Sequence, residues 1–513
     1  MLTPPPSTSS DFSEPDRLIG ELLQPGGCLS LKKLGMESCL SGIDAVPVEG
    51  YKIFRGSSSI PIPYPSEKVS MPWSVGGIGK DGRVQEGRSF HHGRFVQNLR
   101  KKAAGQEGVT LVEATVNELI RDGGTNGVIG VEVTPRGIGL REERSPIKFH
   151  AQITMIIDGC HSKFRKAVLP PSVYPTVRSN FVGLYVLLSL PLLPLPPSRP
   201  LTSFPTTSSI LENPDLPAPH HGHVILHPPT SSPSPSPIGP ILVYQLSPTQ
   251  SRMLIDIPGP RVPSSSSGEL SQFLSTHVTS ILPSSLVPSF EAALDASNTN
   301  DRTKRLKVMP NQYLSTHPPG HGPEGAILVG DSLNMRHPLT GGGMTVAFND
   351  AVLLVEELGG EKVVGEVDAR KNEYGVCKLN EWEKVCERLE EWYWDRKPVA
   401  TSVNVLSIAL YSLFAAGDDN LLQLQKGCFR YLQRGGSSVS GPVSLLSVSV
   451  SLSSPPTPAN LHNPPASTPH PGLSSANSSS SPSTPSGSFS PLLSFGMFWT
   501  ACKVLLPVLW AES

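Results

Sequence analysis

A carboxylate and a run of glycines stand close together in GDSLNMRHPLTGGGM, residues 330–344. Asp331 directly follows a short apolar stretch, and a carboxylate at the end of a buried strand can accept hydrogen bonds from sugar hydroxyls. The glycines Gly341, Gly342 and Gly343 let a backbone approach a flat ring or an anion without a Cβ in the way. They also open a predicted helix, whose first N–H groups favour electron-rich oxygens. The segment as a whole is therefore a candidate cofactor site.

A second candidate is DGCHSKFRKAV, residues 158–168, which follows an apolar run. The Asp158 turn, with Ser162 and Arg165 after it, can hold the diphosphate side of a cofactor and start a helix. An ordinary Asp-Gly turn capped by Ser162 explains the same residues. Taken alone, the segment favours that simpler interpretation.

The segment GRSFHHGRFVQNLRKKA, residues 87–103, predicts a helix. Arg94 and Arg100 are six residues apart and do not share a face cleanly, so one of them can point to a phosphate. His91 and His92 are adjacent, and adjacent side chains diverge on a helix. We therefore expect these histidines to serve packing and hydrogen bonding, and we predict no metal site.

Composition limits the class of protein. The 513 residues carry 42 Lys and Arg against 43 Asp and Glu, and no basic stripe is present, which argues against a nucleic-acid partner. The 46 glycines and 54 prolines indicate that part of the chain is loop. The 7 cysteines form no CxxC pair, which favours reduced thiols in a cytosol-facing protein.

The elements that must position these residues follow from apolar patterning. Strands are predicted at 108–116, 127–133, 148–157, 181–188, 223–227, 241–246, 253–257 and 326–330. A turn is predicted at Pro25–Gly27, and helices at 90–104, about 342–358 and 375–396. The apolar stretch 399–416 is rich in Ser and Asn, whereas 491–510 is long enough to span a bilayer or lie in one.

Six segments in order resemble the squalene monooxygenases, also called squalene epoxidases. They are EPDRLIGELLQPGG (14–27), IDAVPVEGY (43–51), GRSFHHGRF, DGCHSKFRK, GDSLNMRHPLTGGGMTVAF and the stretch 411–447. The resemblance implies an α/β (α+β) chain with the FAD-binding fold of group A flavoprotein monooxygenases. It also implies a β-sheet substrate domain and C-terminal membrane-associated helices.

The resemblance implies roles for individual residues. Those that match FAD-contacting positions are Arg17, Arg100, Val116, Asp158, Asp331, Met344 and the glycines Gly341, Gly342 and Gly343. Tyr51 matches an active-site tyrosine that is held by a glutamine matching Gln24. A half-buried tyrosine at a strand end is the simpler explanation of Tyr51.

The implied reaction is cofactor chemistry, with the protein supplying position and a dry site. Reduced FAD activates O2, and one oxygen atom is transferred to a terminal alkene of squalene, giving 2,3-oxidosqualene for sterol biosynthesis. Electrons come from NADPH through a separate NADPH-cytochrome P-450 reductase. The expected location is the cytosolic side of the endoplasmic reticulum membrane.

The implied domain plan has several parts. They are a disordered lead (1–13), a partial FAD-binding domain (14–170), a substrate domain (171–307) with a Pro/Ser-rich insert (190–239), a return to the FAD-binding domain (308–360), a helical region (361–450), a low-complexity stretch (451–489) and a membrane anchor (490–513).

One departure from the family stands out. The strand, G-x-G-x-x-G turn and helix with which such domains begin have no match, because GGIGKDG (76–82) follows no strand and opens no helix. The expectation is weak FAD binding or none, as in a non-catalytic membrane-associated remnant. A related aromatic hydroxylase is a further alternative, but an aromatic substrate requires no membrane anchor.

Overall fold

The computed structural model describes residues 2–3, 12–65, 86–136, 145–187, 216–227, 237–297, 306–319, 322–359 and 377–447. The glycine-rich segment 76–82, the low-complexity stretch 451–489 and the predicted anchor 490–513 lie outside these residues, as does most of the lead 1–13.

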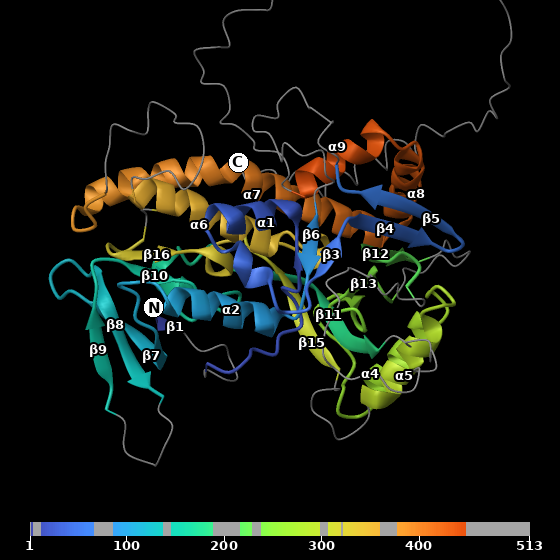
Figure 1. Cartoon of the computed structure of the whole chain (residues 1–513), viewed down its shortest axis with the longest axis horizontal. Helices are drawn as coiled ribbons and strands as arrows, with labels where there is room; N and C mark the ends of the chain where they lie inside the picture. The colour runs from blue at the N-terminus through green and yellow to red at the C-terminus, as the bar shows by residue number, and fades with distance from the viewer. Residues whose placement is uncertain are drawn as a thin grey trace, which may run out of the picture.

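A seven-stranded sheet forms the largest sheet, in the order β15-β11-β14-β13-β12-β4-β5 (Figure 1). Its strands are β4 (Gly50–Arg55), β5 (Ser58–Pro63), β11 (Thr176–Leu187), β12 (His221–Leu226), β13 (Ile241–Gln245), β14 (Gln250–Pro258) and β15 (Lys307–Tyr313). Neighbours pair antiparallel, except that β12 runs parallel to β4. The predicted strands at 181–188, 223–227, 241–246 and 253–257 are confirmed here.

The remaining strands form smaller sheets. They are a four-stranded sheet of β1 (Leu2–Thr3), β7 (Val112–Arg121), β8 (Val128–Pro135) and β9 (Ile147–His150), a parallel pair of β10 (Thr154–Ile156) and β16 (Ala326–Leu328), and a three-stranded sheet of β2 (Leu22–Leu23), β3 (Val46–Val48) and β6 (Gly87–Ser89). Because β10 and β16 are parallel, their carboxyl ends lie at one edge. The turns after them therefore lie side by side.

The helices are α1 (Pro25–Lys33), α2 (His92–Ala104), α3 (Arg165–Val168), α4 (Glu269–Val278), α5 (Val287–Ser297), α6 (Gly343–Gly359), α7 (Trp382–Ala415), α8 (Asp419–Gln433) and α9 (Ser437–Leu446). Short 3-10 turns are η1 (Glu37–Leu40), η2 (Gly330–Ser332) and η3 (Pro338–Thr340). In Figure 1, α6 and α7 run side by side, and the two helices are in contact.

Both faces of the seven-stranded sheet are covered, which explains why its inner strands read as continuous apolar runs. One face and helices α7, α8 and α9 form what we call the first apolar cluster, which includes Ile62, Leu254, Phe414, Phe429 and Val443. The opposite face packs on α4 and α5 through residues such as Met253, Ile255, Leu274 and Phe290. Successive residues of β14 thus point to opposite faces of the sheet: Leu254 belongs to the first apolar cluster, and its neighbours Met253 and Ile255 belong to the core on the other face.

Two predictions of local structure were wrong. The run 148–157 is not one strand, because β9 ends at His150 and pairs with β8, whereas β10 turns away to pair with β16. Pro25–Gly27 is not a loop turn but forms the first turn of helix α1. Proline is tolerated there because the first N–H groups of a helix have no partner within the helix. The helix predicted at 375–396 is confirmed from Trp382 onward, and α7 continues through Pro398 to Ala415, so that it also takes in most of the apolar stretch 399–416.

The large sheet draws strands from distant parts of the sequence. β4 and β5 come from the stretch 14–170, whereas β11 to β14 come from 171–307. β12 lies inside the Pro/Ser-rich insert 190–239, and its His223 is buried between Phe54 and the backbone of Val243. The boundaries between domains stay a prediction.

Candidate active site

Arg165 joins the turn after β10 to the turn after β16. Its buried guanidinium donates hydrogen bonds to the carbonyls of Ser332 (2.8 Å) and Asp331 (3.0 Å). It also donates to the carbonyls of Gly159 (3.2 Å) and Cys160 (3.1 Å). The side chain of Arg165 therefore ties the two turns together, which agrees with the simpler interpretation of this segment as a structural turn. The hydroxyl of Ser162 accepts from the N–H of Arg165, the first residue of α3, at 3.1 Å.

Lys163 connects two further predicted residues. The Asp158 carboxylate accepts a hydrogen bond from the backbone N–H of Lys163 at 2.9 Å. The ammonium group of Lys163 reaches the carbonyls of Val116 at 3.4 Å and Asn117 at 2.5 Å. The other Asp158 oxygen, Oδ1, is buried and has no hydrogen-bond partner. Val116, Asp158 and Asp331 thus lie along one connected edge of the fold.

Asp331 lies among cations. Its side chain is exposed, yet crowding by surrounding protein atoms raises the pKa of its carboxyl group, as expected in a concave setting. The positive charges of Arg336, Arg17 and Arg165 oppose that rise. Arg17 thus stands within electrostatic reach of Asp331. An exposed carboxylate held among arginines suits hydrogen bonding to a ribityl or sugar hydroxyl.

The glycine turn has room beside it. Gly341 has a φ of 62°, in the left-handed region that favours glycine, and ends η3. A Cβ at Gly343 would meet no atom within 4 Å, and the same holds at Gly159 and Gly330. The hydroxyls of Thr340 and Thr345 are buried without hydrogen-bond partners. Of the three glycines Gly343 is the open one, since a Cβ at Gly341 or Gly342 would meet Leu22 or Val403. Open backbone at the first turn of α6 fits the polar edge of a flat heterocycle such as a flavin.

Gln24 and Tyr51 meet at this turn. The amide nitrogen of Gln24 donates to the hydroxyl of Tyr51 and to the carbonyl of Thr340, the latter at 2.6 Å. Tyr51 donates to the same carbonyl at 3.2 Å, and Tyr64 donates to the amide oxygen of Gln24 at 2.6 Å. Burial raises the pKa of Tyr51, so its hydroxyl stays protonated at neutral pH. The predicted contact of Gln24 with Tyr51 is confirmed, whereas its role stays a prediction.

Other predicted residues lie nearby. Arg100 donates to the carbonyl of Ser13 at 3.0 Å and lies over the ring of Phe12, while Met344 packs with the small core around Phe90. His92 contacts the carbonyl of Gly20 at 2.9 Å. Within the stretches that the structure describes, no group of three or more His, Cys, Asp or Glu side chains is placed to hold a metal ion.

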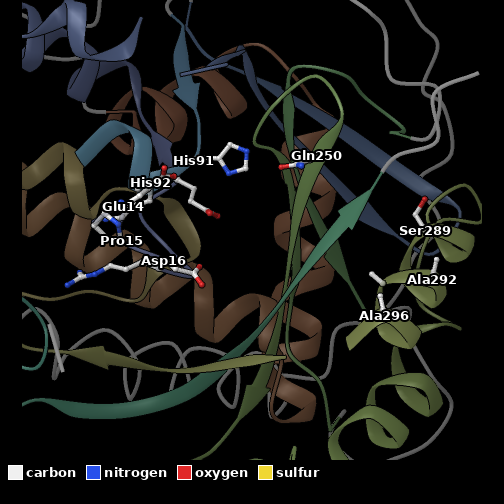
Figure 2. A pocket seen from close by; sticks show the side chains of 13 residues that line it. Glu14, Pro15, Asp16, His91, His92, Gln250, Ser289, Ala292 and Ala296 are labelled. Carbon is white, nitrogen blue, oxygen red and sulfur yellow. The ribbon is translucent and has the colours of Figure 1, made fainter. Parts of the chain in front are cut away.

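A cavity of about 650 Å³ opens beside Arg17. Figure 2 shows Glu14, Asp16, His91 and His92 on one side, with the small residues of α5 across from them. Gln250 of β14 and the buried Glu21 complete the polar wall. Charged side chains such as Glu14, Asp16 and Arg17 stand around this cavity, but most of the surface that lines it is apolar. The lining therefore does not by itself distinguish a cofactor from a hydrocarbon.

Sequence reasoning missed three residues of this site: Tyr64, Lys163 and Thr340. Tyr64 fixes the orientation of the Gln24 amide, which no local motif encodes. Thr340 contributes through its backbone carbonyl, so its residue type carries no signal. Lys163 stands inside the DGCHSKFRK motif and is the one member that the motif could have indicated.

Comparison with known proteins identifies relatives. The family model described as squalene epoxidase matches residues 150–190 and 206–461. Squalene epoxidase of Schizosaccharomyces pombe is 38% identical over 436 residues, covering 85% of this chain and 79% of that protein. Squalene epoxidase 1 of Arabidopsis thaliana is 38% identical over 438 residues, covering 85% and 67%.

Solved structures share the fold. A probable FAD-dependent monooxygenase of Pseudomonas aeruginosa, PqsL, superposes with a TM-score of 0.52 at 15% identity, over 82% of this chain and 91% of that one. A single-residue variant of Klebsiella pneumoniae HpxO, complexed with FAD, gives 0.52 at 13% identity, over 84% and 90%. The chain therefore has the group A flavoprotein monooxygenase fold.

Proposed function

Because the chain belongs to the squalene epoxidase family, we propose that it is an FAD-dependent monooxygenase that epoxidises squalene to 2,3-oxidosqualene with O2. The observation that supports this best is the meeting of Gln24 and Tyr51 on the Thr340 carbonyl. This contact lies directly before the glycine turn and at the margin of the first apolar cluster. It joins a candidate flavin site to a candidate hydrocarbon site.

The residues present fit FAD. Asp331 and Arg17 would hold its sugar and phosphate region, and the open backbone at Gly343 would lie against the flavin. The unpaired hydroxyl of Thr340, which directly precedes the glycine turn, would lie at the polar edge of the ring. When bound, FAD supplies the two-electron redox chemistry that activates O2.

The first apolar cluster would supply the apolar surface beside which a hydrocarbon substrate binds. Tyr51 packs against it, and its other members include Leu226, Leu242 and Tyr244 from the sheet and Phe414 and Phe429 from the helices α7 and α8. These side chains offer large apolar contact and few polar atoms. An alkene bound there would be shielded from water, as oxygen transfer requires.

The Gln24–Tyr51–Tyr64 network would set the boundary between the two sites. Gln24 has both amide hydrogens donated, to Tyr51 and Thr340, and its oxygen accepts from Tyr64. Tyr51 directs its own proton at the Thr340 carbonyl. The network therefore orients the tyrosine and keeps its proton in place, and it supplies no nucleophile to the reaction.

Partners and location are part of the proposal. Electrons would come from NADPH through a separate membrane-bound reductase, at the cytosolic face of the endoplasmic reticulum. Among the described helices, α7 is long and apolar enough to cross a membrane, but 39% of its most apolar window is buried inside the protein. Core helices of soluble proteins pass the same test, so membrane attachment rests on the family and on the apolar stretch 491–510.

The test uses the full chain in detergent, loaded with FAD and desalted. A retained flavin spectrum, followed by formation of 2,3-oxidosqualene with NADPH and reductase, is the expected result. Tyr51→Phe should lower turnover, whereas the matched change Tyr174→Phe, at a side chain that is 65% exposed, should not. A colourless protein without turnover would contradict the proposal for this polypeptide.

A further inference from the structure

The strand β14 carries two buried charges on the face of the first apolar cluster. Arg252 is 1% exposed and Asp256 is 0% exposed, with Leu254 of the cluster between them on the same face. The alternate residues Met253, Ile255 and Ile257 are all apolar and face the opposite core. Two opposite charges on an apolar face are costly to bury, so each needs a specific partner.

Arg252 holds the segment that carries Gln24. It forms a two-pronged ion pair with Glu21, at 2.7 Å and 2.9 Å, and both side chains are buried. Tyr244, which is opposite Arg252 on β13, donates to the same carboxylate at 3.0 Å. Glu21 stands three residues before Gln24, immediately before β2. The ion pair therefore fixes that segment against the large sheet.

Asp256 holds the segment that carries Thr340. Ser179 donates to Asp256 at 2.5 Å, and its oxygen lies 3.1 Å from Nε2 of His337. Nδ1 of His337 accepts from the backbone N–H of Leu339 at 3.2 Å, so the proton must be on Nε2. The chain therefore runs in one direction, from the Leu339 N–H through His337 and Ser179 to the carboxylate.

Two neighbours reinforce this chain. Asn311 of β15 donates to Ser179 at 3.0 Å and to Asp256 at 3.2 Å. The ring of Tyr411 on α7 stacks on His337, with centroids 3.9 Å apart. Burial lowers the pKa of His337, against the attraction of Asp256, which keeps the ring neutral as the chain requires.

The two held segments meet at the proposed site. Gln24 donates to the Thr340 carbonyl at 2.6 Å, and these residues follow Glu21 and His337 by three positions each. A buried ion pair rarely stabilises a fold more than an apolar pair of the same size, so stability alone does not explain this arrangement. We propose that Arg252 and Asp256 are positioning residues, which fix the Gln24 segment and the glycine turn relative to each other from one strand.

The proposal rests on the proposed function for its effect on turnover, but placement can be measured without it. The experiment compares the full flavin-free chain with Asp256→Leu, Asp256→Asn and the double change Glu21→Gln with Arg252→Met. Hydrogen–deuterium exchange is followed in peptides covering 20–26 and 337–343, with β8 as the internal reference. The kcat and KM for squalene and the urea midpoint are measured alongside.

We expect Asp256→Leu to raise exchange at 337–343 by about tenfold and the double change to do so at 20–26, with β8 unchanged. The turnover number of these variants should fall while KM stays nearly constant. Asp256→Asn can still accept the hydrogen bond from Ser179, so its exchange and its turnover number should match those of the parent chain. Uniform exchange across all peptides, or an Asp256→Asn variant as impaired as Asp256→Leu, would overturn the proposal. If placement changes as expected but no variant, including the parent chain, turns over squalene, the proposed function fails and the positioning role stands.

Discussion

Gly341 is a position where one added methyl group should disturb the candidate site directly. Its φ of 62° lies in the left-handed region, and a Cβ there would lie 2.9 Å from Cδ2 of Leu22 and 3.4 Å from the amide nitrogen of Gln24. The Tyr51 hydroxyl would be 3.7 Å away. The change Gly341→Ala therefore strains the backbone and also presses on the segment that carries Gln24.

The cost has two parts. Alanine in the left-handed conformation costs about 1–2 kcal/mol. Crowding of the buried Leu22 side chain adds about 1–3 kcal/mol, because a packed core accommodates an extra methyl group only by moving neighbours. We expect a total loss of unfolding free energy of about 2–5 kcal/mol, the sum of these two ranges, and a displaced Gln24 that weakens flavin retention and turnover.

Gly35 supplies the matched control. It has a φ of 67°, lies exposed after α1, and a Cβ there would meet no atom within 4 Å. Gly35→Ala should therefore lose the backbone part alone, about 1–2 kcal/mol, and keep its flavin. Urea unfolding and the flavin spectrum after desalting would be measured on both variants. Equal losses in the two proteins, with flavin retained in both, would refute the reasoning.

Three further outcomes are expected. Arg165→Met leaves buried carbonyls unpaired and should cost about 3 kcal/mol in urea unfolding; an unchanged midpoint would contradict its clamping role. Burial lowers the pKa of His223 to about 4, below the unfolded value of about 6.5, so stability is full above that upper value and is lost as the pH falls towards 4. In His223→Gln, the decrease in unfolding free energy on going from neutral to acid pH should be smaller by about 3 kcal/mol. It would be measured as a smaller difference between the urea midpoints at the two pH values. Gln24→Leu should reduce epoxide formation more than Tyr51→Phe, because it removes three hydrogen bonds of the network whereas Tyr51→Phe removes two; the reverse order would contradict the network.

The sequence predicted most strands of the fold, because alternating or continuous apolar runs report burial directly. It failed where chain direction mattered more than residue type. The run 148–157 is apolar enough for one strand, but Ala151–Ile153 redirects it between two sheets. Pro25–Gly27 has turn composition, yet Gly27 is needed for close packing, since a Cβ there would lie 2.8 Å from the Thr345 hydroxyl.

The candidate site was predictable to the extent that its residues belong to motifs. The resemblance placed Gln24 beside Tyr51, and the side-chain contact agrees. It could not identify Tyr64 or the Thr340 carbonyl, because hydrogen bonds between distant segments leave no local pattern. The sequence of the turn also left open a phosphate site at Arg165. An arginine next to a turn gives the same sequence pattern whether it binds an anion or, as here, backbone carbonyls.

The parallel pairing of β10 with β16 has a consequence for how the chain folds. Residues 157–325 lie between the two strands and include β11 to β15 of the large sheet. During synthesis on a ribosome, β10 emerges long before β16, so the hydrogen bonds between the two strands cannot form until β16 has also emerged. Closing so long a loop is slow, and the large sheet is expected to assemble first. The flavin half of the site would then be completed late, when Arg165 can finally bridge the two turns.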